Sequence, residues 1–73
     1  SNWKVTDDKL DIEVVVPANT TVLLKLPGVR FDSIKEGGSE WKKVKGIRLD
    51  SQRDNTVVFS LQSGTYRFSA RMN

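Results

Sequence analysis

Apolar and polar residues alternate most regularly between residues 10 and 26. The apolar positions are Leu10, Ile12, Val14 and Val16 before a polar break, and Val22, Leu24 and Leu26 after it. A period of two is typical of a β-strand with one buried face, and the break, Pro17–Thr21, consists of turn-forming residues. The pattern predicts a β-hairpin in which Val14 faces Leu24. A register shifted by two residues, with Val14 opposite Val22, keeps the same faces and remains an alternative.

The outer face of this predicted hairpin carries both charged and apolar side chains. In the first register, Glu13 faces Lys25 and Val15 faces Leu23. Oppositely charged pairs and apolar pairs both favour cross-strand pairing. On a free-standing domain, however, Val15 and Leu23 would lie in water. Exposed apolar residues of this kind indicate a surface that the rest of a longer chain covers.

The last third of the chain predicts a second hairpin around a Ser63-Gly64 turn. Its inward positions are Val57, Phe59 and Leu61 on one strand, and Tyr66, Phe68 and Ala70 on the other. A two-residue turn places Leu61 opposite Tyr66. Val58 then lies on the outer face, where it adds to the exposed apolar residues of the first hairpin.

The remaining segments are shorter and less regular. Trp3–Thr6 predicts a strand that pairs with the start of the first hairpin. Val29–Lys35 predicts a weaker strand, Glu40–Leu49 a strand or irregular segment with a bend at Gly46, and Asp50–Asn55 a polar loop. Six or seven short strands without a clear helix are typical of an antiparallel β-sandwich or a small barrel. The whole chain is long enough for one all-β domain at most.

Composition excludes several kinds of chemistry. The chain contains no cysteine and no histidine, so it lacks disulfides, thiolate metal sites and Ser-His nucleophile pairs. We therefore expect this chain to perform no catalysis and to hold no cofactor and no metal. Its net charge of +3 is small, and no apolar run approaches the roughly 20 residues that span a bilayer. We interpret a chain that starts at Ser1, without an initiator Met, as a piece of a longer protein.

Two pairs of carboxylates suggest chemistry at first sight. Asp11 and Glu13 share one face of a strand at about 7 Å, a spacing compatible with an inverting glycosidase. They lie on the predicted solvent face, however, so a charged, ion-paired surface is the favoured interpretation. Asp7 and Asp8 are interpreted as a polar turn, because a calcium loop needs six or more oxygen ligands.

Trp3 and Trp41 have three candidate roles. A small domain usually needs its tryptophans for burial, but indole rings also suit the apolar faces of sugars. Trp41 adjoins a basic cluster that consists of Lys42, Lys43, Lys45 and Arg48. With Phe31 and Tyr66, this cluster would suit the single-strand-binding surface of an OB-fold, although a solvated edge is the more common use of such residues. Packing, sugar contact and nucleic-acid binding stay open, in that order of preference.

Four segments of the chain together resemble one known family. They are Val14–Pro27, with the pattern V-x-V-P-A-N-T-T followed by L-P; Ile34–Gly38; Gly46-Ile47; and Leu61–Phe68, which contains S-G-x-Y-x-F. In this order, after a leading Trp3, they resemble the C-terminal domain of bacterial α-L-rhamnosidases of glycoside hydrolase family 78. Related helical-barrel glycosidases share the P-A-N-T-T and S-G-x-Y-x-F segments.

The resemblance implies a small antiparallel β-sandwich that accompanies a catalytic domain. In that family the sandwich follows an (α/α)6 barrel, which hydrolyses terminal α-L-rhamnosyl bonds, and none of the barrel's catalytic positions occurs in this chain. The resemblance also implies a secreted or periplasmic enzyme that acts on rhamnose-containing glycans. We expect the domain to have no nucleic-acid partner and no membrane span.

The residues expected to dock on the barrel are Val15, Leu23 and Val58, with Trp41 as a possible anchor. The alternative function is a carbohydrate-binding module that contacts sugar through Trp3 or Trp41. An OB-fold that binds nucleic acid is a less favoured third interpretation.

Overall fold

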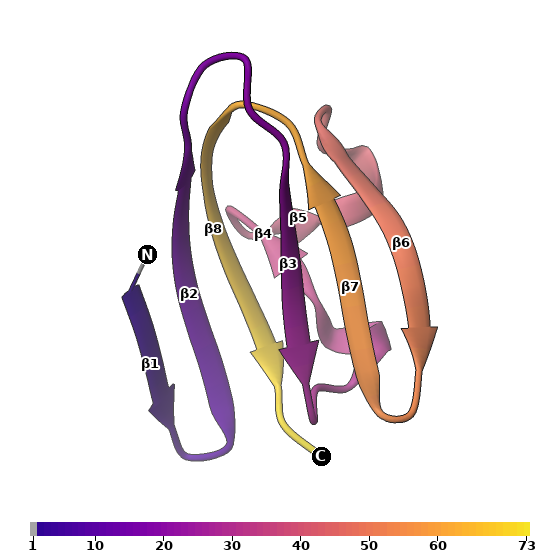
Figure 1. The fold of residues 1–73 in the computed structure, drawn as a ribbon. Helices are drawn as coiled ribbons and strands as arrows, with labels where there is room; N and C mark the ends of the chain where they lie inside the picture. Colours follow the sequence, from indigo (N-terminus) through magenta and orange to yellow (C-terminus); the bar gives the residue numbers. More distant parts are fainter. Residues whose placement is uncertain (1) are drawn as a thin grey trace.

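Two antiparallel sheets are stacked on each other in the structure (Figure 1). The computed structural model describes residues 2–73. The strand order of the first sheet is β1 (Asn2–Thr6), β2 (Lys9–Val16), β8 (Gly64–Arg71), β4 (Lys35–Glu36) and β5 (Ser39–Glu40). The order of the second sheet is β3 (Val22–Pro27), β7 (Thr56–Leu61) and β6 (Ile47–Arg53). The predicted all-β sandwich is confirmed.

Strands β2 and β3 are not paired with each other, so the hairpin predicted for residues 10–26 is wrong. β2 pairs with β1 and β8, whereas β3 pairs with β7 in the other sheet. The loop Pro17–Thr21 crosses between the sheets at one end of the sandwich (Figure 1). A loop of this length can span the roughly 10 Å between stacked sheets. It therefore joins two strands that face each other across the core through their side chains.

The second predicted hairpin is wrong for the same reason. β7 lies between β3 and β6 in the second sheet, and β8 lies between β2 and β4 in the first. Leu61 is therefore opposite Val22 and Ile47, while Tyr66 is opposite Val14. This crossing lies at the same end of the sandwich as the first (Figure 1).

The inward positions predicted from the alternation do form the core. The side chains of the core cluster are Leu10, Ile12, Val14, Val16, Leu24, Leu26, Val29, Ile34, Val57, Phe59, Leu61, Tyr66, Phe68 and Ala70. Val22 is only partly buried, at the edge of this cluster. The alternation thus predicts the face correctly, because a side chain turns inward in the same way whether its strand pairs with one neighbour or another.

Two tight hairpins join strands that are neighbours in a sheet. The predicted pairing of Trp3–Thr6 with the start of the next strand is confirmed, and Asp7 and Asp8 form its turn with φ of 49° and 64°. A hairpin between β6 and β7 replaces most of the polar loop predicted after Leu49, with Asp54 and Asn55 at φ of 53° and 59°. Positive φ at both central residues is the requirement of a type I′ turn, which Asp and Asn tolerate.

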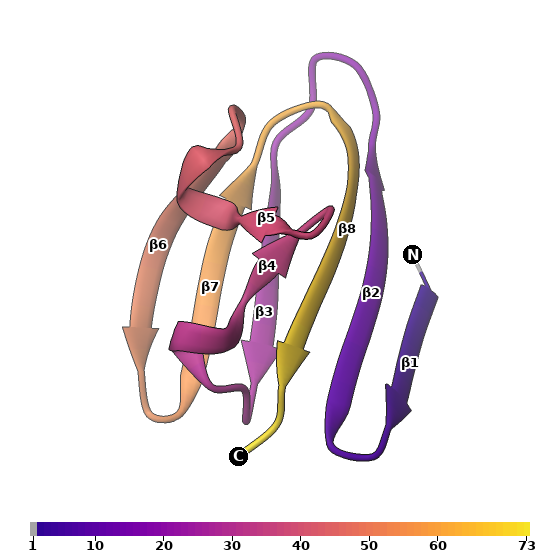
Figure 2. The same cartoon turned by 180° about the vertical axis from the view of Figure 1, so that it is seen from behind.

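The segment between β3 and β6 is mostly irregular, so the strand predicted for Val29–Lys35 is largely wrong. It contains two 3-10 turns, η1 (Phe31–Ser33) and η2 (Trp41–Lys43), and the very short strands β4 and β5. For Glu40–Leu49 the irregular alternative applies up to the start of β6, and Gly46 stands at a bend with φ of 98°. Figure 2 shows this segment in front of the gap between β8 and β6.

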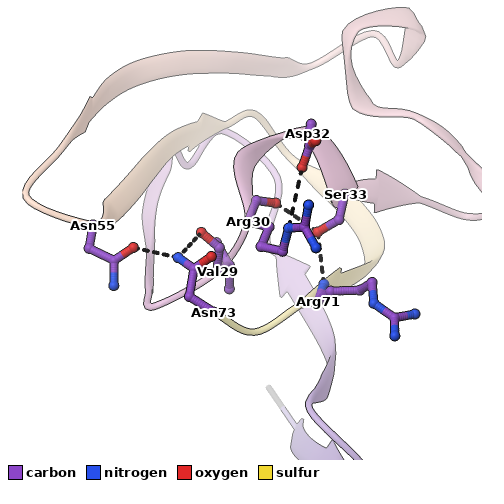
Figure 3. A network of polar contacts seen from close by, with 7 residues as sticks. All are labelled: Val29, Arg30, Asp32, Ser33, Asn55, Arg71 and Asn73. Carbon is purple, nitrogen blue, oxygen red and sulfur yellow. Dashed lines mark hydrogen bonds and ion pairs between the residues drawn. The ribbon is translucent and has the colours of Figure 1, made fainter.

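Polar contacts fasten the C-terminal residues to the loop that follows β3 and to the turn between β6 and β7 (Figure 3). The side-chain amide of Asn73 donates a hydrogen bond of 2.6 Å to Oδ1 of Asn55. The backbone N–H of Arg71 donates to Oγ of Ser33 at 2.8 Å, and that hydroxyl donates to the carbonyl of Arg30 at 2.7 Å. These contacts close the end of the sandwich that lies away from the two crossings.

Tyr66 closes the opposite end, beneath the second crossing. Its ring is buried in the core, and its hydroxyl donates a hydrogen bond of 2.8 Å to the carbonyl of Gln62. A Cβ atom added to Gly46 would lie 2.6 Å from the same hydroxyl oxygen. The bend at Gly46 therefore requires glycine for two reasons: its φ is positive, and a Cβ atom would collide with the tyrosine.

Replacing Gly46 with alanine should destabilise the domain more than the same change at Gly37. Both glycines have positive φ, but nothing lies within 4 Å of the Cβ position at Gly37. We expect Gly37→Ala to cost about 1 kcal/mol from backbone strain, and Gly46→Ala about 1–3 kcal/mol more from crowding against Tyr66. Urea unfolding midpoints of the two variants measure the difference. Equal midpoints would contradict the role given to the tyrosine contact.

The stability of the domain should fall at alkaline pH through Tyr66. Burial, and secondly the carboxylate of Glu36, raise the pKa of Tyr66 above its ordinary value of 10.0. A raised pKa in the folded state means that this contribution is complete below about pH 10 and is lost as the pH rises through the folded-state value. We expect Tyr66→Phe to be less stable than the wild type by about 1 kcal/mol at neutral pH.

The measurement is urea unfolding of both proteins from neutral pH to above pH 10. The stability difference should shrink in the alkaline range, because only the wild type carries the phenol. A difference that stays constant over the whole range would be evidence against this linkage.

Candidate docking surface

Trp3 and Val5 form an apolar surface that extends the core beyond the edge of the second sheet. They lie directly opposite Ile12 and Leu10 in the β1–β2 ladder, and residues opposite each other point to the same face of a sheet. Ile12 and Leu10 are 3% and 2% exposed, whereas Trp3 and Val5 are 55% and 58% exposed. We call Trp3 and Val5 the apolar overhang, because they face the same way as the core but remain uncovered.

The overhang follows from the unequal number of strands in the two sheets. The first sheet has five strands and the second has three. The two crossings join β2 to β3 and β7 to β8, and β1 is the edge strand of the first sheet on the side away from β7 and β6 (Figure 1). The sequence indicated the β1 strand and its pairing. It did not indicate that Val5 is exposed, because the alternation of apolar and polar residues does not show how many strands each sheet contains.

Val15 and Leu23 are exposed as predicted, at 63% and 58%, but they do not form one patch. Val15 is opposite Thr65 in the first sheet, and Leu23 is opposite Ser60 in the second. The predicted cross-strand pair of Val15 and Leu23 is therefore wrong. Each residue lies on the outer face of its own sheet, because its neighbours in sequence belong to the core.

Val58 differs from the expectation of an exposed residue. Its side chain is only 9% exposed, although it points away from the core cluster. It lies on β7, the middle strand of the second sheet, with Lys25 opposite on one side and Ser51 on the other. Neighbouring side chains on both flanks cover it, and long stems such as that of lysine shield apolar surface effectively.

Trp41 is part of an aromatic cluster that packs against the core. Its ring centroid lies 4.8 Å from that of Phe59 and 5.9 Å from that of Phe31. Phe59 in turn stacks on Phe68 at 5.7 Å. Trp41 is partly buried in this position. A shallow hollow beside it is lined by Phe31, Trp41, Asp32 and Glu40, among other residues.

The residues considered for an OB-fold surface are brought together only in part, because Phe31, Trp41 and Lys42 line one hollow and Tyr66 does not. Tyr66 belongs to the core and donates its hydroxyl proton to Gln62, so its ring is not available for stacking. Phe31 contacts Trp41 edge-on. Within the basic cluster, Lys43 forms an ion pair of 3.7 Å with Glu40.

Asp11 and Glu13 lie on the outer face of the first sheet among basic side chains. Arg67 is opposite Glu13 in the β2–β8 ladder, and its Nε lies 3.0 Å from a carboxylate oxygen of Glu13. Lys4 is opposite Asp11. The predicted contact of Glu13 with Lys25 is wrong, because Lys25 belongs to the other sheet. Solvent-exposed pairs of opposite charge are typical of a sheet face in contact with water.

Residues 2–73 contain no group of three or more His, Cys, Asp or Glu side chains that could hold a metal ion. In the same part of the chain, no helix has the length and apolar character needed to cross a bilayer.

Comparison with protein families matches residues 1–46 to the bacterial α-L-rhamnosidase C-terminal domain. The chain belongs to this family. An α-L-rhamnosidase of Formosa agariphila is 31% identical to it over 71 residues, which cover 97% of this chain. The same match covers 8% of the relative, so the chain spans only a small part of that protein's length. No solved structure matches the chain.

Membership of the rhamnosidase C-terminal domain family confirms the resemblance noted in the sequence. The two most distinctive motif segments now have structural positions. Pro17–Thr21 forms the first crossing between the sheets, and Gln62-Ser63 forms the second. The motifs therefore coincide with the connections that make this chain a sandwich.

Trp41 and Trp3 should differ sharply in their contribution to folding. Trp41→Ala removes ring contacts with Phe59 and Phe31, and we expect it to lower stability by about 2–4 kcal/mol. Trp3→Ala removes a ring that is mostly in water, and we expect a loss below about 1 kcal/mol. Denaturant unfolding of the 73-residue domain measures both. A Trp3 variant that loses as much as the Trp41 variant would show that the overhang is covered within the domain itself.

Proposed function

We propose that this chain is the non-catalytic C-terminal domain of an α-L-rhamnosidase and packs on the catalytic (α/α)6 barrel of the same polypeptide. The family match over residues 1–46 is the observation that carries the proposal. The barrel would hydrolyse terminal α-L-rhamnosyl bonds of rhamnose-containing glycans, and the enzyme would be secreted or periplasmic. The sandwich would stabilise the barrel by covering part of its apolar surface.

The placement of carboxylates supports a non-catalytic role. Asp11 and Glu13 lie on an open sheet face, and Glu13 is ion-paired with Arg67. An inverting glycosidase needs one carboxylic acid with a raised pKa and one carboxylate that activates water. Enzymes raise the pKa of the acid by burying its carboxyl group away from basic side chains. The outer face of β2 provides the reverse environment.

Exposed apolar side chains support the packing role. On a domain of 73 residues, Trp3, Val5, Val15 and Leu23 are all more than half exposed. Apolar side chains of this size commonly mark a surface that another domain covers. Of the four docking residues predicted from the sequence, Val15 and Leu23 keep this character, while Val58 and Trp41 are largely occupied within the domain.

Deleting the domain from the full-length enzyme tests the proposal. We expect the isolated domain to leave an aryl α-L-rhamnoside unhydrolysed, and the truncated enzyme to unfold at a lower temperature than the full-length enzyme because it exposes the surface that was covered. The measurements are hydrolysis of the chromogenic substrate and calorimetric unfolding. A truncated enzyme with an unchanged unfolding temperature would contradict the packing role.

Carbohydrate binding is a second candidate, favoured by the hollow beside Trp41. Its lining includes the aromatic rings of Phe31 and Trp41 and the carboxylates of Asp32 and Glu40. Titration of the domain with rhamnose-containing oligosaccharides should then quench the fluorescence of Trp41 and leave that of Trp3 unchanged. The variants Trp3→Phe and Trp41→Phe assign the signal. An unchanged spectrum at millimolar sugar would dispose of this candidate.

A further inference from the structure

We propose that an extended segment of the preceding part of the enzyme chain adds to the free edge of β3 and covers the apolar overhang of Trp3 and Val5. This inference rests on the proposed function, in which the domain packs on the rest of its own polypeptide. It adds the face of the domain that is used and the kind of segment that binds there.

The apolar overhang is the first observation. Trp3 and Val5 continue the core-facing rows of Ile12 and Leu10, yet more than half of each side chain is in water. Ile12 and Leu10 themselves are buried. The overhang is therefore uncovered within residues 2–73, and a segment that covers it would present apolar side chains to it.

The free edge of β3 is the second observation. Within residues 2–73, β3 pairs with β7 and with no other strand. The backbone N–H and C=O groups on its other side are available to a new strand. Lys25 and Pro27, residue types that discourage strand addition, stand toward the end of β3. The first part, Val22–Leu24, is free of such residues.

The two observations indicate the same occupant. A strand paired with β3 would lie about 4.8 Å from it, in the plane of the second sheet. The two sheets are about 10 Å apart, and the first crossing joins β3 to β2, the neighbour of β1. We therefore place the added strand over β1. Such a strand would satisfy the free backbone groups of β3, and its alternate side chains would contact Trp3 and Val5. A helix would cover the apolar side chains but leave the edge unpaired.

Family membership indicates that the strand comes from the same chain. The family is a C-terminal domain, and the match covers 8% of the Formosa agariphila α-L-rhamnosidase, so most of that protein lies outside the matched segment. Chain that precedes the described residues leads into β1, the strand of the overhang (Figure 1). A tethered segment binds at a high effective concentration, so even a modest contact is occupied.

Hydrogen exchange of the full-length enzyme tests this assignment at β3. In the wild type we expect amides on both sides of β3 to exchange slowly, because both would be hydrogen-bonded. Val5→Glu places a charge under the added strand and should speed exchange at the outward amides of β3 at least tenfold. The matched control is Thr6→Glu, which introduces the same charge one residue away on the other face of β1, opposite Lys9, and should leave β3 unchanged. Amides of β7 report whether the sandwich itself stays folded in each variant.

The other outcomes separate this inference from the proposed function. If Val15→Glu lowers the unfolding temperature of the full-length enzyme and Val5→Glu does not, the domain packs through another face and this inference is wrong. If neither variant has an effect and deletion of the domain also has none, the packing role itself is wrong. If Val5→Glu converts a dimer of the enzyme into a monomer, a second copy occupies the site and the assignment to the same chain is overturned.

Discussion

The apolar layer between the two sheets is the interaction on which the rest of this domain depends. Each strand contributes every second side chain to it, and Phe59, Leu26 and Leu61 lie in it without contact with water. A chain of this length has little other means of stabilisation, since it contains no cysteine and the ion pairs found within residues 2–73 lie at the surface. Loops, turns and the C-terminal tail are arranged so that this layer closes.

Two crossings between the sheets make that layer possible. Pro17–Thr21 and Gln62-Ser63 each carry the chain from one sheet to the other, so strands adjacent in sequence face each other across the core. Tyr66 supports the second crossing by its hydrogen bond to Gln62, and Gly46 leaves the space that this tyrosine needs. Two of the four motif segments noted in the sequence contain these crossings, and a third contains Gly46.

The unequal sheets leave apolar side chains of the first sheet uncovered. A three-stranded sheet covers only part of a five-stranded one, and the uncovered part begins at the N-terminal strand. Charges occupy the outer face of the first sheet, where Glu13 and Arg67 pair, while apolar groups occupy the uncovered inner face. This distribution of charged and apolar side chains is the basis of the packing that we propose.

The sequence by itself determined which side chains point inward, because a strand turns alternate residues to opposite faces regardless of its partner. It also identified the β1–β2 hairpin, the bend at Gly46, the exposure of Val15 and Leu23, and the family. Strand partners were decided only by the tertiary structure. A polar break of a few residues can close a hairpin or cross between sheets, and both leave the same alternation.

Partner choice in turn decided the surface. Val58 is covered because β7 is a central strand, and Trp41 packs on Phe59 because an irregular segment folds over the side of the core. Val5 is exposed because β1 has no strand above it. Each of these depends on how many strands each sheet contains and in what order. That number is a property of contacts between residues far apart in the sequence, which local periodicity does not record.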